Sequence, residues 1–319
     1  MKTNIGIVGY GNLGKSVERE ILKNNKLNLV AIFSRRTIKS ISGTLVEPYE
    51  NHVNYKSKID IMILCGGSLS DLEWQSRELL NHFNIINSFD THSKIKNEVE
   101  SLSKIAKNSH HTAIISCGWD PGIFSIVRSL SYIISKENPI TFWGKGISMG
   151  HSDAIRNQNG VIDAIQFTVP NKDAVKLAKT IGSTKNTPRH FRKCFVVSDV
   201  PNKNKLASTI KNIPHYFKGQ PTTVEFVDSL KLLKLKEKMG HKGEIISRFK
   251  TSENSNCEVN FSVKMKSNPE FTARIMICYI QAIKHFQSLN IFTAVTPTSI
   301  PVSFLFDNKD PHLWSLCWQ

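Results

Sequence analysis

The sequence predicts an α/β fold in which an N-terminal, doubly wound parallel sheet of the Rossmann type is followed by a second α+β domain. Three observations support this fold class. A glycine turn separates an apolar run from a helical pattern near the N-terminus, further apolar runs alternate with helical patterns to about residue 118, and mostly strand-like alternation follows. We therefore expect residues 1–118, completed by the helical segment from about 269 to 319, to form one domain and residues 119–268 the other.

The stretch from Asn4 to Arg36 has the pattern of a βαβ unit. Residues 5–8 make a short apolar run typical of a buried strand, and the turn Gly9-Tyr-Gly11-Asn-Leu-Gly14 follows directly. Helical spacing occupies residues 16–23, and residues 29–33 give a second apolar run. The glycine turn thus lies between the first strand and the first helix.

A glycine turn in this position is a dinucleotide-binding fingerprint. Gly9 permits the tight turn, Gly11 removes a side chain where the backbone approaches a pyrophosphate, and Gly14 lets helix and strand pack closely. Asn12 and Leu13, between them, also belong to the expected cofactor-binding residues. The alternative is a glycine turn with a structural role only.

The end of the second strand indicates which dinucleotide is bound. A carboxylate there would accept hydrogen bonds from the adenosine ribose, whereas this chain has Ser34-Arg35-Arg36. Two guanidinium groups and a hydroxyl can hold a 2′-phosphate through charge-assisted hydrogen bonds. The sequence therefore favours NADP(H) over NAD(H), the alternative being a solvated basic pair.

Three further strands are expected to end in small or polar residues. Because the carboxyl ends of parallel strands form the ligand crevice of open α/β sheets, these turns should contact the cofactor. The turns are Cys65-Gly66-Gly67-Ser68, Ser88-Phe89-Asp90 and Cys117-Gly118-Trp119-Asp120-Pro121-Gly122. For the first turn, the alternative is a tight connection in which Ser68 caps a helix starting at Leu69.

The pattern changes around Gly118. Residues 123–135 form an amphipathic helical pattern, and residues 141–153 are a glycine-punctuated loop that opens into a short helix, whose N-terminal amides suit a carboxylate. Residues 271–289 predict a long helix. The expected strands, largely antiparallel, are residues 164–169, 194–197, 223–227, 244–246 and 258–264.

Composition limits the classes of partner. The 319 residues are 40% hydrophobic, and lysine plus arginine exceed aspartate plus glutamate by 42 − 26 = 16. Such a balance raises nucleic acid and membranes as partners. The basic residues are scattered, however, without a long block or a stripe with interleaved aromatics, so we expect neither partner.

Cysteine usage and the N-terminal sequence indicate the compartment. The six cysteines are far apart, with no CxxC spacing and no histidine pair suited to zinc, so we expect reduced thiols and no metal. The N-terminus lacks the pattern of a signal peptide, and no run of about twenty apolar residues occurs. We expect a cytoplasmic protein.

Eight segments stand in the order and approximate spacing of one known family, from residue 4 to about residue 290. They are GIVGYGNLGKSVE, AIFSRR, SFDTH, GWDPGIFSI, FWGKGISMGHSDAI, QFTVP, RKCFVV and SNPEFTA. On these segments the chain closely resembles meso-diaminopimelate dehydrogenases, NADP-dependent enzymes that oxidatively deaminate the D-centre of meso-2,6-diaminopimelate. The resemblance implies L-2-amino-6-oxopimelate (tetrahydrodipicolinate) and ammonia as products, a homodimer, and a second domain for substrate binding and dimerisation.

The resemblance also implies roles at the reacting centre. It places Asp90 and Asp120 at the reacting ammonium as catalytic residues, with Trp119 and Trp143 shaping the pocket beside the nicotinamide. By themselves, Asp90 would be a loop-capping residue about as often as a ligand, Asp120 a turn residue and Trp143 a core residue.

The distal L-centre needs a cation for its carboxylate and acceptors for its ammonium. By resemblance, Arg192 and Thr168 bind the carboxylate, while His241 and Asn268 make polar contacts. Each has an ordinary alternative: a solvated strand edge for Arg192, a strand former for Thr168, a surface loop for His241 and a helix cap for Asn268.

The segment Gly146–Asp153 completes the expected substrate site. Met149 and Gly150 are expected to touch the substrate and Asp153 to orient its surroundings. His151 is more in keeping with a helix start than with a catalytic base.

The chain departs from the family pattern at three places. The usual Pro-His-Gly-Gly is here Gly240-His241-Lys242-Gly243, which loses a rigid residue and adds a charge beside His241. Cys117 replaces a usual threonine, and the tail after Thr296 does not match. No role is assigned to that tail.

Two other functions are open to the sequence. One is a related NADP-dependent reductase of the aspartate-derived pathway, such as homoserine dehydrogenase or dihydrodipicolinate reductase, although these lack the GWDPG and GHSDA segments. The other is a catalytically idle NADP(H)-sensing protein, which loss of Asp120 or Arg192 would favour. Both residues are present.

Overall fold

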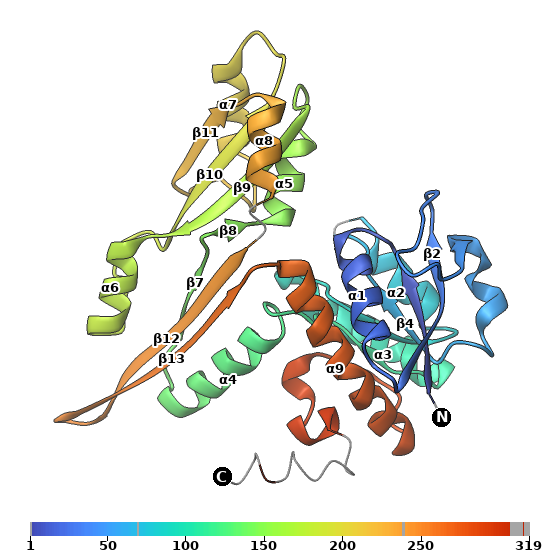
Figure 1. Cartoon of the computed structure of the whole chain (residues 1–319). Helices are drawn as coiled ribbons and strands as arrows, with labels where there is room; N and C mark the ends of the chain where they lie inside the picture. Colours follow the sequence, from blue (N-terminus) through green and yellow to red (C-terminus); the bar gives the residue numbers. More distant parts are fainter. Residues whose placement is uncertain (1, 69, 238–239, 307–314, 316–319) are drawn as a thin grey trace. The chain divides into compact units, whose positions relative to one another are not determined.

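The computed structural model describes residues 2–68, 70–237, 240–306 and 315 (Figure 1). The chain divides into two units, Met1–Ile126 together with Pro269–Gln319, and Val127–Asn268. Buried apolar clusters lie within each unit. Leu69 and most of the tail after residue 306 fall outside the described residues.

The first unit contains a seven-stranded sheet in which every paired strand is parallel, which confirms the predicted Rossmann-type sheet. The strand order β14-β6-β5-β4-β1-β2-β3 reverses direction between β1 and β4, the kind of switch point where open α/β sheets bind ligands. The strands are β1 (Thr3–Val8), β2 (Leu27–Ser34), β3 (Val46–Pro48), β4 (Ile61–Leu64), β5 (Asn84–Asn87), β6 (Ala113–Ile114) and β14 (Ala294–Val295).

Helices cover the strands of this sheet, and β4 is buried at every position, as expected of a strand covered on both faces. Helix α1 buries Val17 and Ile21, the pair that the helical spacing indicates. Figure 1 shows α1, α2 and α3 beside β2 and β4. The helical elements are α1 (Asn12–Leu22), α2 (Leu72–Leu79), α3 (Ile95–Ser109), α9 (Asn268–Ser288), η1 (Tyr49–Tyr55), η2 (His92–Lys94), η3 (Pro297–Ser299) and η4 (Val302–Leu305).

The C-terminal segment contributes to the same sheet. Strand β14 pairs in parallel with β6 through Ala294 opposite Ala113 and Val295 opposite Ile114. The Ser103 hydroxyl of α3 donates a hydrogen bond to the Ala294 carbonyl at 3.3 Å. Residues about 180 positions apart in sequence therefore complete one edge of the parallel sheet.

The second unit contains two smaller sheets, ordered β11-β10-β9-β8 and β13-β12-β7. The pairs are antiparallel except for β10 with β11, in agreement with the largely antiparallel expectation. The strands are β7 (Ile140–Trp143), β8 (Gly146–Ile147), β9 (Asp163–Pro170), β10 (His190–Val197), β11 (Thr222–Phe226), β12 (His241–Ser252) and β13 (Ser255–Met265).

Helices α5 and α8 contact β9, whereas α6 contacts β12. Apolar side chains of α7, β9 and β10 form one buried cluster that includes Phe217. Helix α4 runs through the point in the sequence where the two units meet. The bounds are α4 (Ile123–Ser135), α5 (Met149–Arg156), α6 (Lys172–Ile181), α7 (Lys203–Lys211) and α8 (Ser229–Lys236).

Two local expectations differ from the structure. Helix α2 begins at Leu72 with Asp71 at its N-cap, so Ser68 is not the cap. A tight turn precedes the helix, in which the Gly67 carbonyl accepts hydrogen bonds from the amides of Ser70, Asp71 and Leu72. The β12–β13 hairpin is longer than predicted, since its hydrogen-bonded pairing continues from the buried centre into exposed polar residues at its tip.

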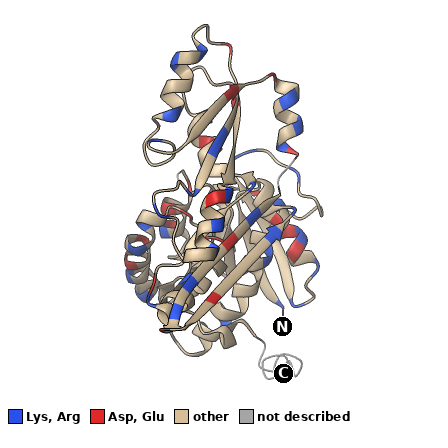
Figure 2. Ribbon diagram, turned by 90° about the vertical axis from the view of Figure 1, so that its left-hand side faces the viewer, with Lys and Arg blue, Asp and Glu red and all other residues tan. Residues whose placement is uncertain are grey.

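Basic and acidic residues are spread over elements of both units, as Figure 2 shows. Among the described residues, no helix has both the length and the apolar character that crossing a bilayer requires. The same part of the chain contains no group of three or more His, Cys, Asp or Glu side chains arranged to hold a metal ion.

Candidate functional site

The glycine turn after β1 has the geometry of a phosphate-binding turn. Gly9 has φ = +85°, a conformation that L side chains rarely adopt. A Cβ added to Gly14 would lie 2.3 Å from the Gly9 carbonyl oxygen, whereas one added to Gly11 would meet no atom within 4 Å. The first and third glycines are therefore required by the fold, and the second leaves open space beside the backbone.

The start of α1 suits an anion. Gly11 is its N-cap and provides no side-chain hydrogen bond, and the first turn, which includes Asn12, Leu13 and Gly14, contains no acidic residue. The first amides of a helix lack intrahelical acceptors and carry the positive end of the helix dipole. The residues present thus fit a dinucleotide pyrophosphate at this turn.

The basic pair after β2 is exposed, and its two members are held differently. Arg35 donates from Nη2 to Asp71 Oδ1 at 2.5 Å, and its guanidinium lies 5.8 Å from the centre of the Trp74 ring. The backbone N–H of Arg36 donates to Ser34 Oγ at 3.1 Å, and the Ser34 hydroxyl can donate in return to the Arg36 carbonyl. The structure therefore fixes Arg35 through its side chain and Arg36 through its backbone.

The turns after β4 and β5 are tied to each other. The Asp90 amide donates to Ser68 Oγ at 3.1 Å, and the Phe89 amide donates to the side-chain carbonyl of Asn87 at 3.0 Å. The Gly67 amide donates to Asp71 Oδ2 at 3.3 Å. The bond between Asp90 and Ser68 joins the two turns, which follow the paired strands β4 and β5, as the sequence predicts. Burial raises the pKa of the Cys65 thiol, which disfavours a thiolate there.

The segment from Gly118 to Gly122 follows β6, the next strand of the sheet. The Gly118 amide donates to the Pro121 carbonyl at 2.9 Å, which closes a tight turn around Trp119 and Asp120. Trp119 is only 6% exposed and packs edge-to-face on Phe124, with ring centres 5.1 Å apart. Asp120 is half-buried and Asp90 is exposed. The two predicted catalytic residues follow β6 and β5, which are adjacent strands of one sheet.

In the second unit, Arg192 and Thr168 face each other across the β9–β10 pair. The guanidinium donates from Nη1 to Thr168 Oγ1 at 2.6 Å, while its buried Nε has no hydrogen-bond partner. Among the described residues, no carboxylate lies within ion-pair distance of this cation. Burial lowers the pKa of Arg192 from its ordinary value. Within the described part of the chain, the arrangement leaves a partly buried cation that is not paired with a carboxylate.

Arg192 also lines a cavity of about 680 Å³. Lys185 and Arg189 add positive charge to its wall, and Trp143 adds an aromatic surface. The full lining is Trp143, Thr184, Lys185, Asn186, Thr187, Pro188, Arg189, His190, Arg192, Gly219, Gln220 and Pro221. A cavity with this lining suits an anionic group on a small organic ligand.

His190, which the sequence prediction did not include, connects the aromatic and basic walls. Its Nε2 accepts a hydrogen bond from the Trp143 amide at 2.8 Å, and its ring stacks on the Trp143 indole with centres 5.1 Å apart. Burial, together with the nearby Arg192 charge, lowers the pKa of His190 to about 3. A neutral imidazole is therefore available as the acceptor. Strand alternation, which places His190 and Arg192 on one face, was the signal available in the sequence.

His241 lies in β12 and is 5% exposed, so it is not a surface-loop residue. Its Nδ1 lies 2.8 Å from the Lys242 carbonyl. A Cβ added to Gly146 would come within 2.3 Å of the His241 ring, so that glycine permits β8 to approach the imidazole. Gly146 of β8 is also paired with Thr168 of β9, so this glycine lies beside both His241 and Thr168.

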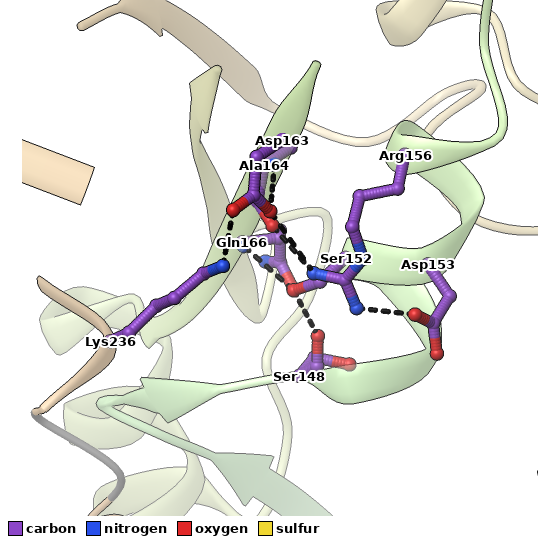
Figure 3. A network of polar contacts seen from close by, with 8 residues as sticks. All are labelled: Ser148, Ser152, Asp153, Arg156, Asp163, Ala164, Gln166 and Lys236. Atoms are coloured by element: carbon purple, nitrogen blue, oxygen red, sulfur yellow. Dashed lines mark hydrogen bonds and ion pairs between the residues drawn. The ribbon is translucent and has the colours of Figure 1, made fainter. Parts of the chain in front are cut away.

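The start of α5 carries the remaining predicted residues. Met149 is 48% exposed, and a Cβ at Gly150 would meet no atom within 4 Å. Asp153 is paired with Arg156, as Figure 3 shows, and Arg156 in turn donates to the Ala164 carbonyl at 2.7 Å. Arg156 therefore ties α5 to β9, and Asp153 pairs with Arg156 within the same helix.

The same helix start carries His151, and α9 carries Asn268. His151 is within hydrogen-bond distance of the Ser148 hydroxyl, 2.8 Å away, and burial followed by the Arg192 charge lowers its pKa to about 4. It is a packed helix-start residue, as expected. Asn268 is the first residue of α9.

The family model for the diaminopimelic acid dehydrogenase C-terminal domain matches residues 118–267. A meso-diaminopimelate D-dehydrogenase from Acetivibrio thermocellus is 41% identical over 317 residues, covering 95% of this chain and 94% of the relative. One from Ureibacillus thermosphaericus is 40% identical and covers 95% of each chain.

Solved structures of related dehydrogenases are similar to this chain over almost its whole length. The C. glutamicum DAP dehydrogenase in complex with DAP superposes with a TM-score of 0.92 at 32% identity, covering 99% of this chain and 98% of that one. An engineered D-amino acid dehydrogenase bound to NADP+ gives a TM-score of 0.91 at 30% identity over 99% of both chains. The chain therefore belongs to the meso-diaminopimelate D-dehydrogenase family.

Proposed function

We propose that the protein catalyses the reversible, NADP-dependent oxidative deamination of the D-centre of meso-2,6-diaminopimelate. The products are L-2-amino-6-oxopimelate, which cyclises to tetrahydrodipicolinate, ammonia and NADPH. Family membership over 95% of the chain supports this activity. It also argues against the two alternatives considered for the sequence, a different reductase and an idle NADP(H) sensor.

The observation that carries the proposal is the unneutralised cation of Arg192. Arg192 is partly buried, its guanidinium is bonded to a neutral hydroxyl, and its buried Nε has no hydrogen-bond partner. Desolvating a cation in this way costs free energy, which a bound anion would offset. The L-centre carboxylate of the substrate supplies such an anion and can bind a guanidinium bidentately. Thr168 Oγ1 would contribute to the same carboxylate, with His241, Asn268, Met149 and Gly150 around the L-centre.

The acidic residues of the first unit would bind the reacting D-centre. Asp90 and Asp120 would hold the ammonium, and one of them would take a proton so that nitrogen presents a lone pair. Bound NADP+ supplies the hydride acceptor for Cα, and water then hydrolyses the resulting imine to the keto acid and ammonia. Trp119 and Trp143 would exclude solvent beside the reacting carbon.

The cofactor would be bound by the turns at the strand ends of the parallel sheet. Gly9–Gly14 would hold the pyrophosphate, and Ser34, Arg35 and Arg36 the 2′-phosphate. The segments Cys65–Ser68, Ser88–Asp90 and Gly118–Gly122 would contact the rest of the dinucleotide.

We also propose the cellular setting. The enzyme would act in the cytoplasm as a homodimer, in the direction of reductive amination, to supply lysine and peptidoglycan precursors. Exposed apolar side chains on α4, including Leu130, Ile133 and Ile134 at 55–64% exposure, support the dimer, because such groups are usually covered.

The direct test is incubation of the purified protein and NADP+ with meso-, LL- and DD-diaminopimelate. We expect rapid NADPH formation with the meso isomer, slower formation with DD, which has no L-centre, and none with LL. A folded protein that binds NADP+ yet reduces it with none of the isomers would contradict the proposal and favour the idle sensor.

Replacing Arg35 and Arg36 together with alanine tests the choice of cofactor. The affinity for NADP+ should fall by about a hundredfold, because two charge-assisted contacts are lost, while the affinity for NAD+ should change little. Titration calorimetry with both dinucleotides measures the two changes. Equal losses for NADP+ and NAD+ would remove these arginines from the 2′-phosphate site.

A further inference from the structure

Glu18 of α1 is a fully buried acid that the proposed mechanism does not use. Every partner of its carboxylate is a neutral donor: the Tyr10 hydroxyl, the Ser40 and Ser42 hydroxyls at 2.6 Å each, and the amides of Ile41 at 3.3 Å and Ser42 at 3.2 Å. No cation pairs with it among the described residues. Burial opposes ionisation, but these hydrogen bonds outweigh it and lower the pKa of Glu18 to about 2.

The hydrogen bonds of Glu18 join two parts of the expected cofactor site. Tyr10 belongs to the glycine turn, and its hydroxyl accepts a hydrogen bond from the Ile41 amide at 2.9 Å. Ser40 and Ser42 belong to the segment that follows the basic pair of β2. Residues 37–45 form no helix or strand, so these side-chain contacts provide much of what holds the segment in place.

The two arginines depend on this segment unequally. Arg35 is already held by Asp71 and lies over Trp74. Arg36 has no such side-chain partner among the described residues, and four residues separate it from Ile41. The Arg36 backbone is bonded to Ser34 on one side and continues on the other into the segment that Glu18 holds, so the direction in which Arg36 points depends on both.

We infer that Glu18 is a positioning residue for recognition of the cofactor's 2′-phosphate, because it fixes residues 40–42 and thereby presents Arg36 to the adenosine ribose. This inference rests on the NADP(H) function proposed above. A buried carboxylate with several donors is rigid, since loss of any one donor leaves a costly unsatisfied charge. Glu18 thus acts on cofactor choice without touching the cofactor.

The test is a double-mutant cycle between Glu18→Gln and Arg36→Ala, with the dissociation constants of NADP+ and NAD+ measured by titration calorimetry. Glu18→Gln should weaken NADP+ about tenfold and NAD+ less than twofold, because only the 2′-phosphate contact is displaced. In the Arg36→Ala background, the same change should alter NADP+ affinity less than twofold. Equal weakening of both dinucleotides, or an undiminished effect without Arg36, would overturn the inference.

Glu20→Gln is the matched control, because it removes the same charge from the same helix while its partners are the exposed Lys23 and Arg274. It should leave both dissociation constants unchanged. Should Glu18→Gln fail to fold, the Ser40→Ala/Ser42→Ala variant removes the donors on the segment side, and a selective loss of NADP+ is again expected. Binding alone is measured, so a protein that shows the coupling but does not oxidise meso-diaminopimelate would contradict only the proposed activity.

Discussion

Arg192 is fixed in place by the strand pair that carries it. Thr168 lies opposite it on β9, the hydroxyl-to-guanidinium hydrogen bond is 2.6 Å long, and the Arg192 side chain is partly buried. A side chain held in this way loses little conformational entropy when a carboxylate binds. The residue is therefore preorganised for the ligand proposed here.

Arg192→Lys should raise KM for the diamino acid by about tenfold or more and leave cofactor affinity unchanged. A lysine cannot bond Thr168 and a carboxylate through one planar fork. Lys193→Ala is the control, because strand alternation turns this exposed neighbour to the other face. An unchanged KM in Arg192→Lys would place Arg192 outside the substrate site.

His190→Phe should keep the ring stacked on Trp143 but remove the acceptor of the Trp143 amide. Leaving that donor unpaired should cost about 1–3 kcal/mol of stability and shift the indole, so that KM for the diamino acid rises. His190→Gln, which retains an acceptor, should recover part of both effects. Urea unfolding and steady-state kinetics of the two variants measure them, and identical behaviour would show that the hydrogen bond is unimportant.

At the scale of elements, two glycines of the β1–α1 connection are expected to serve different ends: Gly14 the packing of the fold and Gly11 the binding of the cofactor. Gly14→Ala would force a Cβ to within 2.3 Å of the Gly9 carbonyl, so we expect a loss of about 1–3 kcal/mol of stability from overpacking. Gly11→Ala meets no protein atom within 4 Å, so stability should be nearly unchanged while NADP+ affinity falls. Thermal unfolding and NADP+ titration distinguish the two outcomes, and full NADP+ affinity in Gly11→Ala would place the pyrophosphate elsewhere.

At the scale of the whole molecule, buried neutral histidines make stability depend on pH. The pKa values of His190 and His151 fall from about 6.5 to about 3 and about 4, so between these values the unfolded chain binds protons that the folded chain does not. Stability should therefore be highest above pH 6.5 and decline on acidification, by at most about 1.4 kcal/mol per pH unit for each histidine.

Unfolding free energies measured from pH 7 to pH 5 test this dependence. In His190→Gln, the pH slope should fall by the contribution of one histidine, because that group no longer titrates in the unfolded chain. A slope equal to that of the unsubstituted protein would show that His190 is protonated in the folded state.

The sequence by itself determined the parallel sheet, the order of its first elements and the family. These depend on local signals: apolar runs of strand length, helical spacing at Val17 and Ile21, and a glycine turn whose chemistry is set within six residues. The roles of Asp90, Asp120 and Arg192 were predicted through resemblance, since isolated polar residues at strand ends have ordinary structural explanations.

Only the tertiary structure decided which side chains meet. The pairing of His190 with Trp143, of Asp71 with Arg35 and of Glu18 with the segment around Ser40 joins residues 47, 36 and 22 positions apart. Local pattern cannot encode such contacts, because they arise when separate strands and loops are brought together by burial of apolar surface. The same burial set the charge states of His190 and Glu18, which depend on the solvent and the donors that surround each group in the folded chain.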